Sequence, residues 1–319
     1  MNYNFCTLFD KKYILNGLAL YNSLLSHVEN FNLFVLCLDD ETFNLLYNFN
    51  FKNIVLFSLS EIEDSDLLLA KNNRTKSEYY WTLASFFTNY VLKNNPDINH
   101  IAYLDSDLYF FSSPQLIYEE LGDKSILIIK HNYVPRLNYL NRKGIYNVGM
   151  VIFKNDEVGR KCLEDWKDQC LFWCYDRDEE KRFGDQKYLD YWLEQYKKVH
   201  VLKNKGGGVA PWNVEKYELI KKNNQIFVDE DELIFYHFHT FKIIGNNKFI
   251  FHSSFYSLND KIINLIYNPY VEEIKKSVNA IKSIDLDFNY SYNSSEGFLD
   301  RMKQKFKRFL FLVVFYIKK

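Results

Sequence analysis

Apolar residues in the first third of the chain form short continuous runs separated by segments with helical spacing. The runs at 3–9, 33–38 and 53–57 predict buried strands. Between the first two runs, apolar residues recur three and four positions apart from Ile14 to Val28, which predicts a helix. Strands that are apolar on both faces and alternate with helices are typical of a parallel sheet. This region therefore predicts a doubly wound β-α-β-α-β unit that binds a nucleotide.

The same alternation continues to residue 238. It predicts strands at 101–104, 126–130, 148–153, 199–202 and 233–238. It predicts helices at 77–92, with Ser77 as the N-cap, at 156–171 and at 188–196. No repeat or low-complexity segment interrupts this pattern. We therefore expect one α/β domain over residues 1–275, followed by a polar linker and a basic tail over residues 276–319.

Composition and charge narrow the class of protein. The chain has 319 residues, of which 47% are hydrophobic, so it can form a substantial core. Lys and Arg number 40 against 41 Asp and Glu, which leaves a net charge of −1 and no global basic field for nucleic acid. Aromatic residues make up 18% of the chain. They are expected mainly in the core, and some can line a sugar or base pocket.

The cysteines and the N-terminus indicate a cytoplasmic protein. The five cysteines include no CxxC pair, and we expect reduced core thiols rather than a disulfide framework or a zinc site. The N-terminus lacks the pattern of a signal peptide. The longest apolar run, Phe309 to Ile317, has nine residues, whereas a membrane span needs about 20.

The sharpest chemical feature is an acidic pair after a predicted buried strand, in the segment IAYLDSDLYFF at 101–111. Asp105 and Asp107 follow the strand directly. Ligands of open α/β sheets bind beyond the carboxyl ends of such strands. Carboxylate oxygens suit Mg²⁺ or Mn²⁺, and such an ion can bridge a diphosphate and stabilise its charge as it leaves. A D-x-D pair is also common in plain solvated turns, so the pair alone is a weak signal.

Five ordered motifs resemble one family. They are FCTLFDKKYILNGLALYNSL at the first strand and helix, YLDSD, YNVGMVIF, RFGDQKYLD and HFHTFK. Together they resemble the GT-A fold glycosyltransferases, in particular the retaining family that includes bacterial lipopolysaccharide galactosyl- and glucosyltransferases and glycogenin. The resemblance covers residues 3–245. It implies a metal-dependent hexosyltransferase with a nucleotide-diphosphate sugar as donor, most typically a UDP-sugar.

The resemblance also implies a set of donor and metal residues. Asp105 and Asp107 would hold Mn²⁺ or Mg²⁺ together with His237, and Asp105 would also contact the nucleotide. Base and ribose contacts would come from residues that follow the first strand, namely Thr7, Asp10 and Tyr13. From the residues alone, Asp10 is as well explained as a helix N-cap. Lys242 would pair with the leaving diphosphate, and His239 would be a phosphate donor or an acceptor-site residue.

The remaining implied residues surround the sugar. Asn147 matches the family's donor-sugar contact, and Gly149 would let the chain pass close to the sugar. Asp185 would bind sugar hydroxyls, and Gln186 matches the position of a weak nucleophile or oxocarbenium stabiliser. Because glutamine is no general base, this set suits front-face displacement with retention, in which the leaving diphosphate takes the acceptor's proton. Asp185 is the alternative if a carboxylate nucleophile is used.

Two departures from the family pattern leave the identity of the donor open. Thr240 stands where a glycine is common, and Thr82 stands where an arginine usually reaches the donor. Arg74 and Lys76 are the nearest cations that can compensate. The segment GGGVAPWN at 206–213 is expected to be a flexible acceptor-side loop or lid, with Trp212 either stacking on a sugar or packed in the core.

The C-terminal segment 298–319 carries seven Lys and Arg residues against one acid, with apolar residues at helical spacing. This pattern predicts a basic amphipathic helix at an anionic membrane surface, or a helix docked on the domain or a partner chain. A membrane contact would suit a lipooligosaccharide or capsule glycolipid as the acceptor, at the inner face of the cytoplasmic membrane.

Two rival functions are weighed against the transferase. A nucleotidyltransferase would carry a glycine-rich basic loop after the first strand, and the segment LFDKKYILNG does not match one. A non-catalytic glycan-binding or scaffold protein on a transferase fold is disfavoured by the intact set Asp105, Asp107, His237 and Asp185-Gln186.

Overall fold

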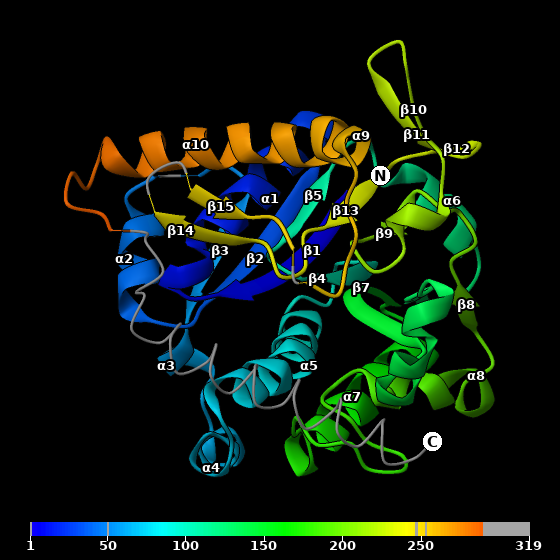
Figure 1. Cartoon of the computed structure of the whole chain (residues 1–319). Helices are drawn as coiled ribbons and strands as arrows, with labels where there is room; N and C mark the ends of the chain where they lie inside the picture. Colours follow the sequence, from blue (N-terminus) through cyan, green and yellow to red (C-terminus); the bar gives the residue numbers. More distant parts are fainter. Residues whose placement is uncertain (1, 50, 246–247, 253, 290–319) are drawn as a thin grey trace, which may run out of the picture.

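The centre of the protein is a seven-stranded sheet in the order β3-β2-β1-β4-β7-β6-β8 (Figure 1). The computed structural model describes residues 2–49, 51–245, 248–252 and 254–289. The strands are β1 Tyr3–Phe9, β2 Phe31–Cys37, β3 Ile54–Ser58, β4 His100–Leu104, β6 Ile126–Lys130, β7 Tyr146–Lys154 and β8 Val199–Val201. Only β7 runs against its two neighbours, and the other pairings in this sheet are parallel. The predicted α/β class with a mostly parallel sheet is confirmed.

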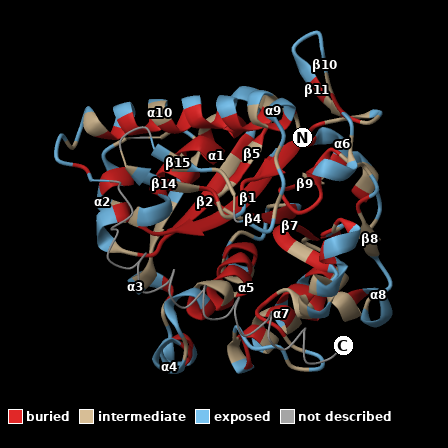
Figure 2. Cartoon of the chain, in the orientation of Figure 1, coloured by how far each residue is buried: buried red, intermediate tan, exposed pale blue. Residues whose placement is uncertain are grey.

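Helices cover both faces of this sheet. On one face lie α1 Ile14–His27 and α10 Asn268–Lys282, which pack against each other. On the other face lie α5 Lys76–Asn94 and α7 Glu157–Phe172, which also pack together. Alternate residues of β1 enter two separate cores, because successive strand side chains point to opposite faces. Figure 2 shows the resulting layer of buried strands between half-exposed helices.

Smaller elements complete the fold. The short helices are α2 Asp40–Tyr47, α3 Leu59–Ile62, α4 Ser65–Asn73, α6 Gln115–Leu121, α8 Trp192–Gln195 and α9 Asp260–Ile262. A second sheet joins β5 Leu108–Phe110, β13 Phe235–His237 and β9 Gly207–Val209. The strands β10 Leu219–Lys222, β11 Gln225–Val228 and β12 Asp231–Glu232 form a projecting sheet, and β14 Lys242–Gly245 pairs with β15 Lys248–Ile250. The second sheet is the most important of these, because the pairing of β5 with β13 places the acidic pair beside the histidines.

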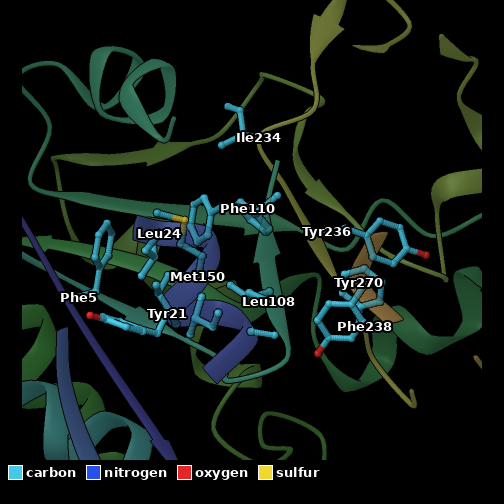
Figure 3. Packing of buried hydrophobic residues seen from close by; sticks show 14 of the residues in the cluster. Phe5, Tyr21, Leu24, Leu108, Phe110, Met150, Ile234, Tyr236, Phe238 and Tyr270 are labelled. Atoms are coloured by element: carbon cyan, nitrogen blue, oxygen red, sulfur yellow. The ribbon is translucent and has the colours of Figure 1, made fainter. Parts of the chain in front are cut away.

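Aromatic packing fixes β13 and the segment after it against α10. Phe238 stacks on Tyr270 with ring centroids 3.7 Å apart, as Figure 3 shows. The Tyr270 hydroxyl accepts a hydrogen bond from Asn16 of α1 at 2.8 Å. Both aromatic side chains are fully buried, and each such burial contributes about 1.5–3 kcal/mol. The segment 237–239 is therefore held in place by the packing of Phe238 in the core.

Several predicted boundaries differ in instructive ways. The long helix is capped by Thr75, not by Ser77, because Thr75 and Glu78 form a reciprocal capping box. The predicted helix at 188–196 is a 3₁₀ segment, Lys187–Tyr191, followed by the short α8. The expected domain boundary at residue 275 falls within α10, which continues to Lys282 with Ile281 buried.

The expectation of a flexible lid at 206–213 is wrong. Most of this segment is buried, and part of it forms β9 beside β13. A Cβ on Gly206 would lie 1.8 Å from the carbonyl oxygen of Glu232, so this glycine permits a close backbone approach. Trp212 is only 4% exposed and belongs to a small apolar cluster.

Three further expectations concern the cysteines, membrane-spanning helices and the C-terminal tail. All five cysteines are buried free thiols, as predicted. Within the described ranges, no helix is both long and apolar enough to cross a bilayer. The basic tail at 298–319 lies outside the described residues.

Candidate metal and donor site

The acidic pair is positioned by the backbone at the end of β4. The N–H of Asp105 donates to the carbonyl of Gly149 at 2.9 Å, which continues the pairing of β4 with β7. The chain then turns into β5, whose first residue, Leu108, lies opposite His237 of β13. The N–H of Phe238 donates to the carbonyl of Asp107 at 2.9 Å. Strand pairing therefore brings His237 beside Asp107, which lies 130 positions earlier in the sequence.

The side chains converge as a divalent cation would require. His237 Nε2 lies 3.1 Å from Asp107 Oδ1 and 3.6 Å from Asp105 Oδ2. One ligand atom each from Asp107, His237 and His239 lies within 4.8 Å of the others. Carboxylate oxygens with imidazole nitrogen form a donor set that suits Mn²⁺ or Mg²⁺. His239, predicted as a donor-binding residue, thus joins the predicted metal ligands.

The charges in this cluster depend on each other. Burial raises the pKa of Asp105, and the nearby Asp107 raises it further, while His237 opposes both. Burial also acts to raise the pKa of Asp107, but the charge and hydrogen bond of His237 outweigh it and hold that pKa below its usual range. In the same way, Asp107 raises the pKa of His237 against the effect of burial. The two acids therefore favour the protonated form of His237, whose charge offsets part of theirs.

Gly149 is tightly enclosed by two site residues. A Cβ at this position would lie 2.5 Å from Asn147 Oδ1 and 2.7 Å from His237 Nδ1. The same Asn147 oxygen accepts a hydrogen bond from the Gly149 N–H at 2.7 Å. The glycine thus leaves room for the imidazole ligand. It also places Asn147 at the border of the metal cluster.

Asp185 and Gln186 lie before the 3₁₀ segment Lys187–Tyr191. Asp185 is 8% exposed. Burial, followed by the charge of Asp105, raises the pKa of Asp185 to about 8. The backbone of Asp185 is fixed by Trp166, whose indole N–H donates to its carbonyl at 2.9 Å. Gln186 Nε2 donates to the carbonyl of Lys143 at 3.1 Å. The charge of Asp105 therefore acts on Asp185, while Gln186 is held by the segment before β7.

The residues predicted to hold the nucleotide lie at the carboxyl end of β1. Asp10 caps the 3₁₀ turn Lys11–Tyr13, as its alternative explanation predicted, by accepting from the Lys12 N–H at 3.0 Å. It also pairs with Lys76 at 2.8 Å and accepts from the Tyr80 hydroxyl at 3.3 Å. Thr7 is buried, and its hydroxyl has no hydrogen-bond partner among the described residues; Tyr13 is 40% exposed. From the sequence, Lys76 is expected only as a compensating cation, and no sequence signal points to Tyr80 as a partner of Asp10.

Arg74 and Lys76 are the two cations predicted to compensate for the lack of an arginine at position 82. Of these, Arg74 binds other residues of the fold. It donates to the Thr82 hydroxyl and to the carbonyl of Leu171. Lys242 begins β14 and is half-buried. Thr240 has a φ of 67°, a left-handed conformation that explains why glycine is common at this position.

Four aromatic residues near the histidines gave no sequence signal as a group. Trp212 lies edge-on to His237 and His239, with ring centroids 5.2 and 5.4 Å away. His131 and Tyr133 stack at 4.7 Å, and Tyr256 lies 6.2 Å from His239. These residues come from separate segments of the chain. Only the tertiary structure assembles them into a wall beside the cluster.

The sheet order and the acidic pair at the end of β4 define the class of the protein as the GT-A fold. The galactosyltransferase LgtC, solved in complex with donor and acceptor sugar analogs, superposes with a TM-score of 0.52 over 86% of this chain and 95% of that chain. The sequences are 12% identical, so the likeness shows the fold alone. The predicted GT-A fold is confirmed.

Sequence comparison then gives the family. No protein-family model matches the sequence. The protein YfnD of Bacillus subtilis (strain 168) is 34% identical over 303 residues, which cover 94% of this chain and 95% of YfnD. YfnF of the same organism is 30% identical over 293 residues, covering 89% and 96%. The chain belongs to the family of these two proteins, both of which are described as uncharacterized.

Proposed function

We propose that this protein is a glycosyltransferase that uses a divalent metal to transfer a sugar, with retention, from a nucleotide-diphosphate donor to a glycan or glycolipid acceptor. The observation that carries the proposal is the convergence of Asp105, Asp107 and His237 beyond the carboxyl end of β4 in a GT-A fold. Ligands of open α/β sheets bind at such strand ends. A UDP-sugar is the donor class that we infer.

The cluster fits a divalent cation on chemical grounds. It combines two partly exposed carboxylates with a buried imidazole that lies against them. Mn²⁺ or Mg²⁺ would be held by Asp105, Asp107 and His237, with His239 within reach. When bound, the ion neutralises charge on a diphosphate leaving group. Lys242 is the proposed cation of this chain that pairs with the same group.

The roles of Asp185 and Gln186 follow from their surroundings. A carboxyl group whose pKa is about 8 carries a proton at neutral pH, which favours hydrogen bonding to sugar hydroxyls over nucleophilic attack. Gln186 accepts no proton as a base, so we assign it to the reactive face of the sugar. LgtC has also been solved as an active-site variant with glutamine replaced by glutamate. A glutamine therefore belongs to the active site of that transferase, which supports the assignment of Gln186.

The acceptor proposal rests on the sequence of the tail. Seven basic residues against one acid at 298–319 suit attachment to an anionic membrane. We therefore propose a peripheral enzyme at the inner face of the cytoplasmic membrane, acting on a lipooligosaccharide or capsule precursor. Binding of the full chain, but not of a chain ending at residue 289, to phosphatidylglycerol vesicles would support this placement.

The decisive experiment is a thermal-shift screen of UDP-, GDP- and dTDP-sugars with and without Mn²⁺. A ligand that binds only the folded state raises the melting temperature. The wild type is compared with Asp107→Asn, which removes a proposed ligand, and with Asp123→Asn, a matched acid that is 88% exposed and lies outside the site. We expect a Mn²⁺-dependent shift for one donor in the wild type and in Asp123→Asn, and none in Asp107→Asn.

A shift without dependence on Mn²⁺ would refute the metal-dependent mechanism. If no nucleotide or nucleotide sugar shifts the wild type, the transferase proposal fails and the non-catalytic scaffold function replaces it.

A further inference from the structure

His131 is a buried histidine whose tautomer the structure defines. It follows β6, is 3% exposed, and its backbone N–H donates to the carbonyl of Ile145 at 2.9 Å. Its ring Nδ1 lies 3.3 Å from the same carbonyl oxygen. A carbonyl oxygen only accepts hydrogen bonds, so Nδ1 carries the hydrogen. In the neutral ring, Nε2 is then an acceptor.

The partner of that acceptor is Asn147, and its orientation is set independently. Asn147 Oδ1 accepts from the Gly149 N–H at 2.7 Å, so the other end of the amide is the Nδ2 group. Nδ2 lies 3.3 Å from His131 Nε2 and donates to it. The two assignments agree, although each comes from a different backbone group. The Asn147 amide nitrogen has a second N–H beyond this bond.

The packing around His131 keeps the ring in one place and uncharged. Its ring stacks on Tyr133 at 4.7 Å with an interplanar angle of 8°, and Trp212 closes its edge at 5.3 Å. Asn213 Nδ2 donates to the His131 carbonyl at 2.9 Å. Burial lowers the pKa of His131 to about 3, and the nearby His237 and His239 act in the same direction. Nε2 thus remains an acceptor throughout the neutral pH range.

We propose that His131 is a positioning residue, which orients Asn147 so that its second amide N–H is presented to the donor sugar. The proposal rests on the transferase function proposed above. An asparagine side chain that turns by 180° exchanges its donor and acceptor ends. The Gly149 N–H and His131 Nε2 together oppose that exchange from both ends. Asn147 is beside His237 through Gly149, so a fixed donor here lies at the border of the metal cluster.

Two substitutions of His131 separate positioning from space filling. In His131→Gln the amide can place its oxygen near the position of Nε2 and keep the acceptor for Asn147. In His131→Asn the shorter amide reaches only the position of Nδ1, so the bond to Ile145 remains and the acceptor is lost. Both variants have similar polarity, and both leave a smaller side chain against Tyr133.

The measurement is the affinity gained from the sugar. Titration calorimetry with Mn²⁺ gives the Kd ratio between UDP and UDP-glucose or UDP-galactose, and between GDP and GDP-mannose. For the preferred donor we expect His131→Asn to reduce this ratio about 3- to 10-fold, as for one hydrogen bond, with unchanged affinity for the free nucleotide. We expect His131→Gln to retain the ratio. Asn147→Ala should match His131→Asn, and the double variant should lose no more than either single one.

Each other outcome has a distinct meaning. Equal losses in both His131 variants, or none in either, would overturn the positioning role. A wild type that binds a free nucleotide as tightly as every tested sugar conjugate would also overturn it, while leaving the nucleotide site intact. A wild type that binds neither with Mn²⁺ would instead overturn the proposed function.

Discussion

Carboxylates lie at the carboxyl ends of the neighbouring strands β1 and β4, and the two sites differ in how far nearby groups balance the negative charge. Asp10 receives its own cation, Lys76, together with the Tyr80 hydroxyl and a backbone N–H. Asp105 and Asp107 are partly exposed, the charge of Asp105 acts on the buried Asp185, and the ion pairs that the described residues form with the pair come from His237. The charge of Asp10 at the end of β1 is therefore balanced by groups of this chain. The β4 group, Asp105 and Asp107, holds more negative charge than the described side chains balance.

The difference separates a stabilising contact from a binding site. Burying a carboxylate is costly unless it is paired, and Asp10 meets that condition within the chain. The β4 group meets it only in part, through the Tyr103 hydroxyl, which donates to Asp105 at 3.0 Å, and through His237, which must carry a proton to form an ion pair. A divalent cation would complete the balance and release that proton. The β4 end is therefore where we expect metal-dependent behaviour, and the β1 end is where we do not.

The largest effect is expected from Gly149→Ala, which disturbs the packing of the residues around the β4 carboxylates. The new Cβ would lie 2.7 Å from His237 Nδ1, so the imidazole must move. We expect a 10- to 100-fold weaker Mn²⁺ affinity, as is typical for disturbed support of a ligand, and a loss of about 1–3 kcal/mol in stability. Calorimetric titration with Mn²⁺ and chemical denaturation measure the two.

The matched control is Gly245→Ala. That glycine has a φ of 153°, and among the described residues no atom lies within 4 Å of an added Cβ, so alanine strains the backbone without touching His237. It should lower stability and leave the Mn²⁺ affinity intact. If Gly149→Ala also binds Mn²⁺ normally, the contrast between the two carboxylate groups is wrong.

The second effect concerns pH and the buried Asp185. Its pKa is about 8 in the folded protein and about 3.9 in an unfolded chain, so the folded state binds the extra proton between these values. This group therefore makes stability fall as pH rises from 5 to 8, by at most about 1.4 kcal/mol per pH unit. Asp185→Asn removes that dependence.

The measurement is the unfolding free energy of both proteins in EDTA at several pH values. We expect the variant to gain on the wild type steadily as pH increases. Added Mn²⁺ should reduce the gain, because a nearby cation favours the ionised carboxyl group. A difference that does not vary with pH would show that Asp185 is ionised in the folded protein.

The smallest effect is expected from Lys76→Met at the compensated end. Lys76 is 64% exposed and Asp10 only 5%, so the ion pair is partly screened by solvent. We expect a loss of about 1 kcal/mol that diminishes with salt, since Asp10 keeps its backbone and tyrosine donors. Mn²⁺ affinity should stay within twofold in a calorimetric titration. A marked change in Mn²⁺ affinity would show that the two strand ends act as one site.

Much of the framework could be predicted from local pattern. The bounds of β1 match exactly those expected, and α1 ends within one residue of its predicted end. Thr75 and Glu78 carry the capping-box pattern of α5 in the sequence itself, two residues before and one residue after the predicted cap, Ser77. The glycines at 206–208 show the limit of composition, because the same residues permit both flexibility and close packing. Only the position of Glu232 against Gly206 decides between them.

For the candidate site as well, some features follow from the sequence and others only from the tertiary structure. The sequence by itself determined the chain order of the seven central strands and of α1, α5 and α7, the acidic pair at the end of β4, and the histidine motif at the last predicted strand. The tertiary structure decided that His237 lies on Asp107, that Lys76 neutralises Asp10, and that His131 holds Asn147. Periodicity reports only which face of an element is buried. Which distant side chains meet depends on strand register and on packing of the whole core, to which every element contributes.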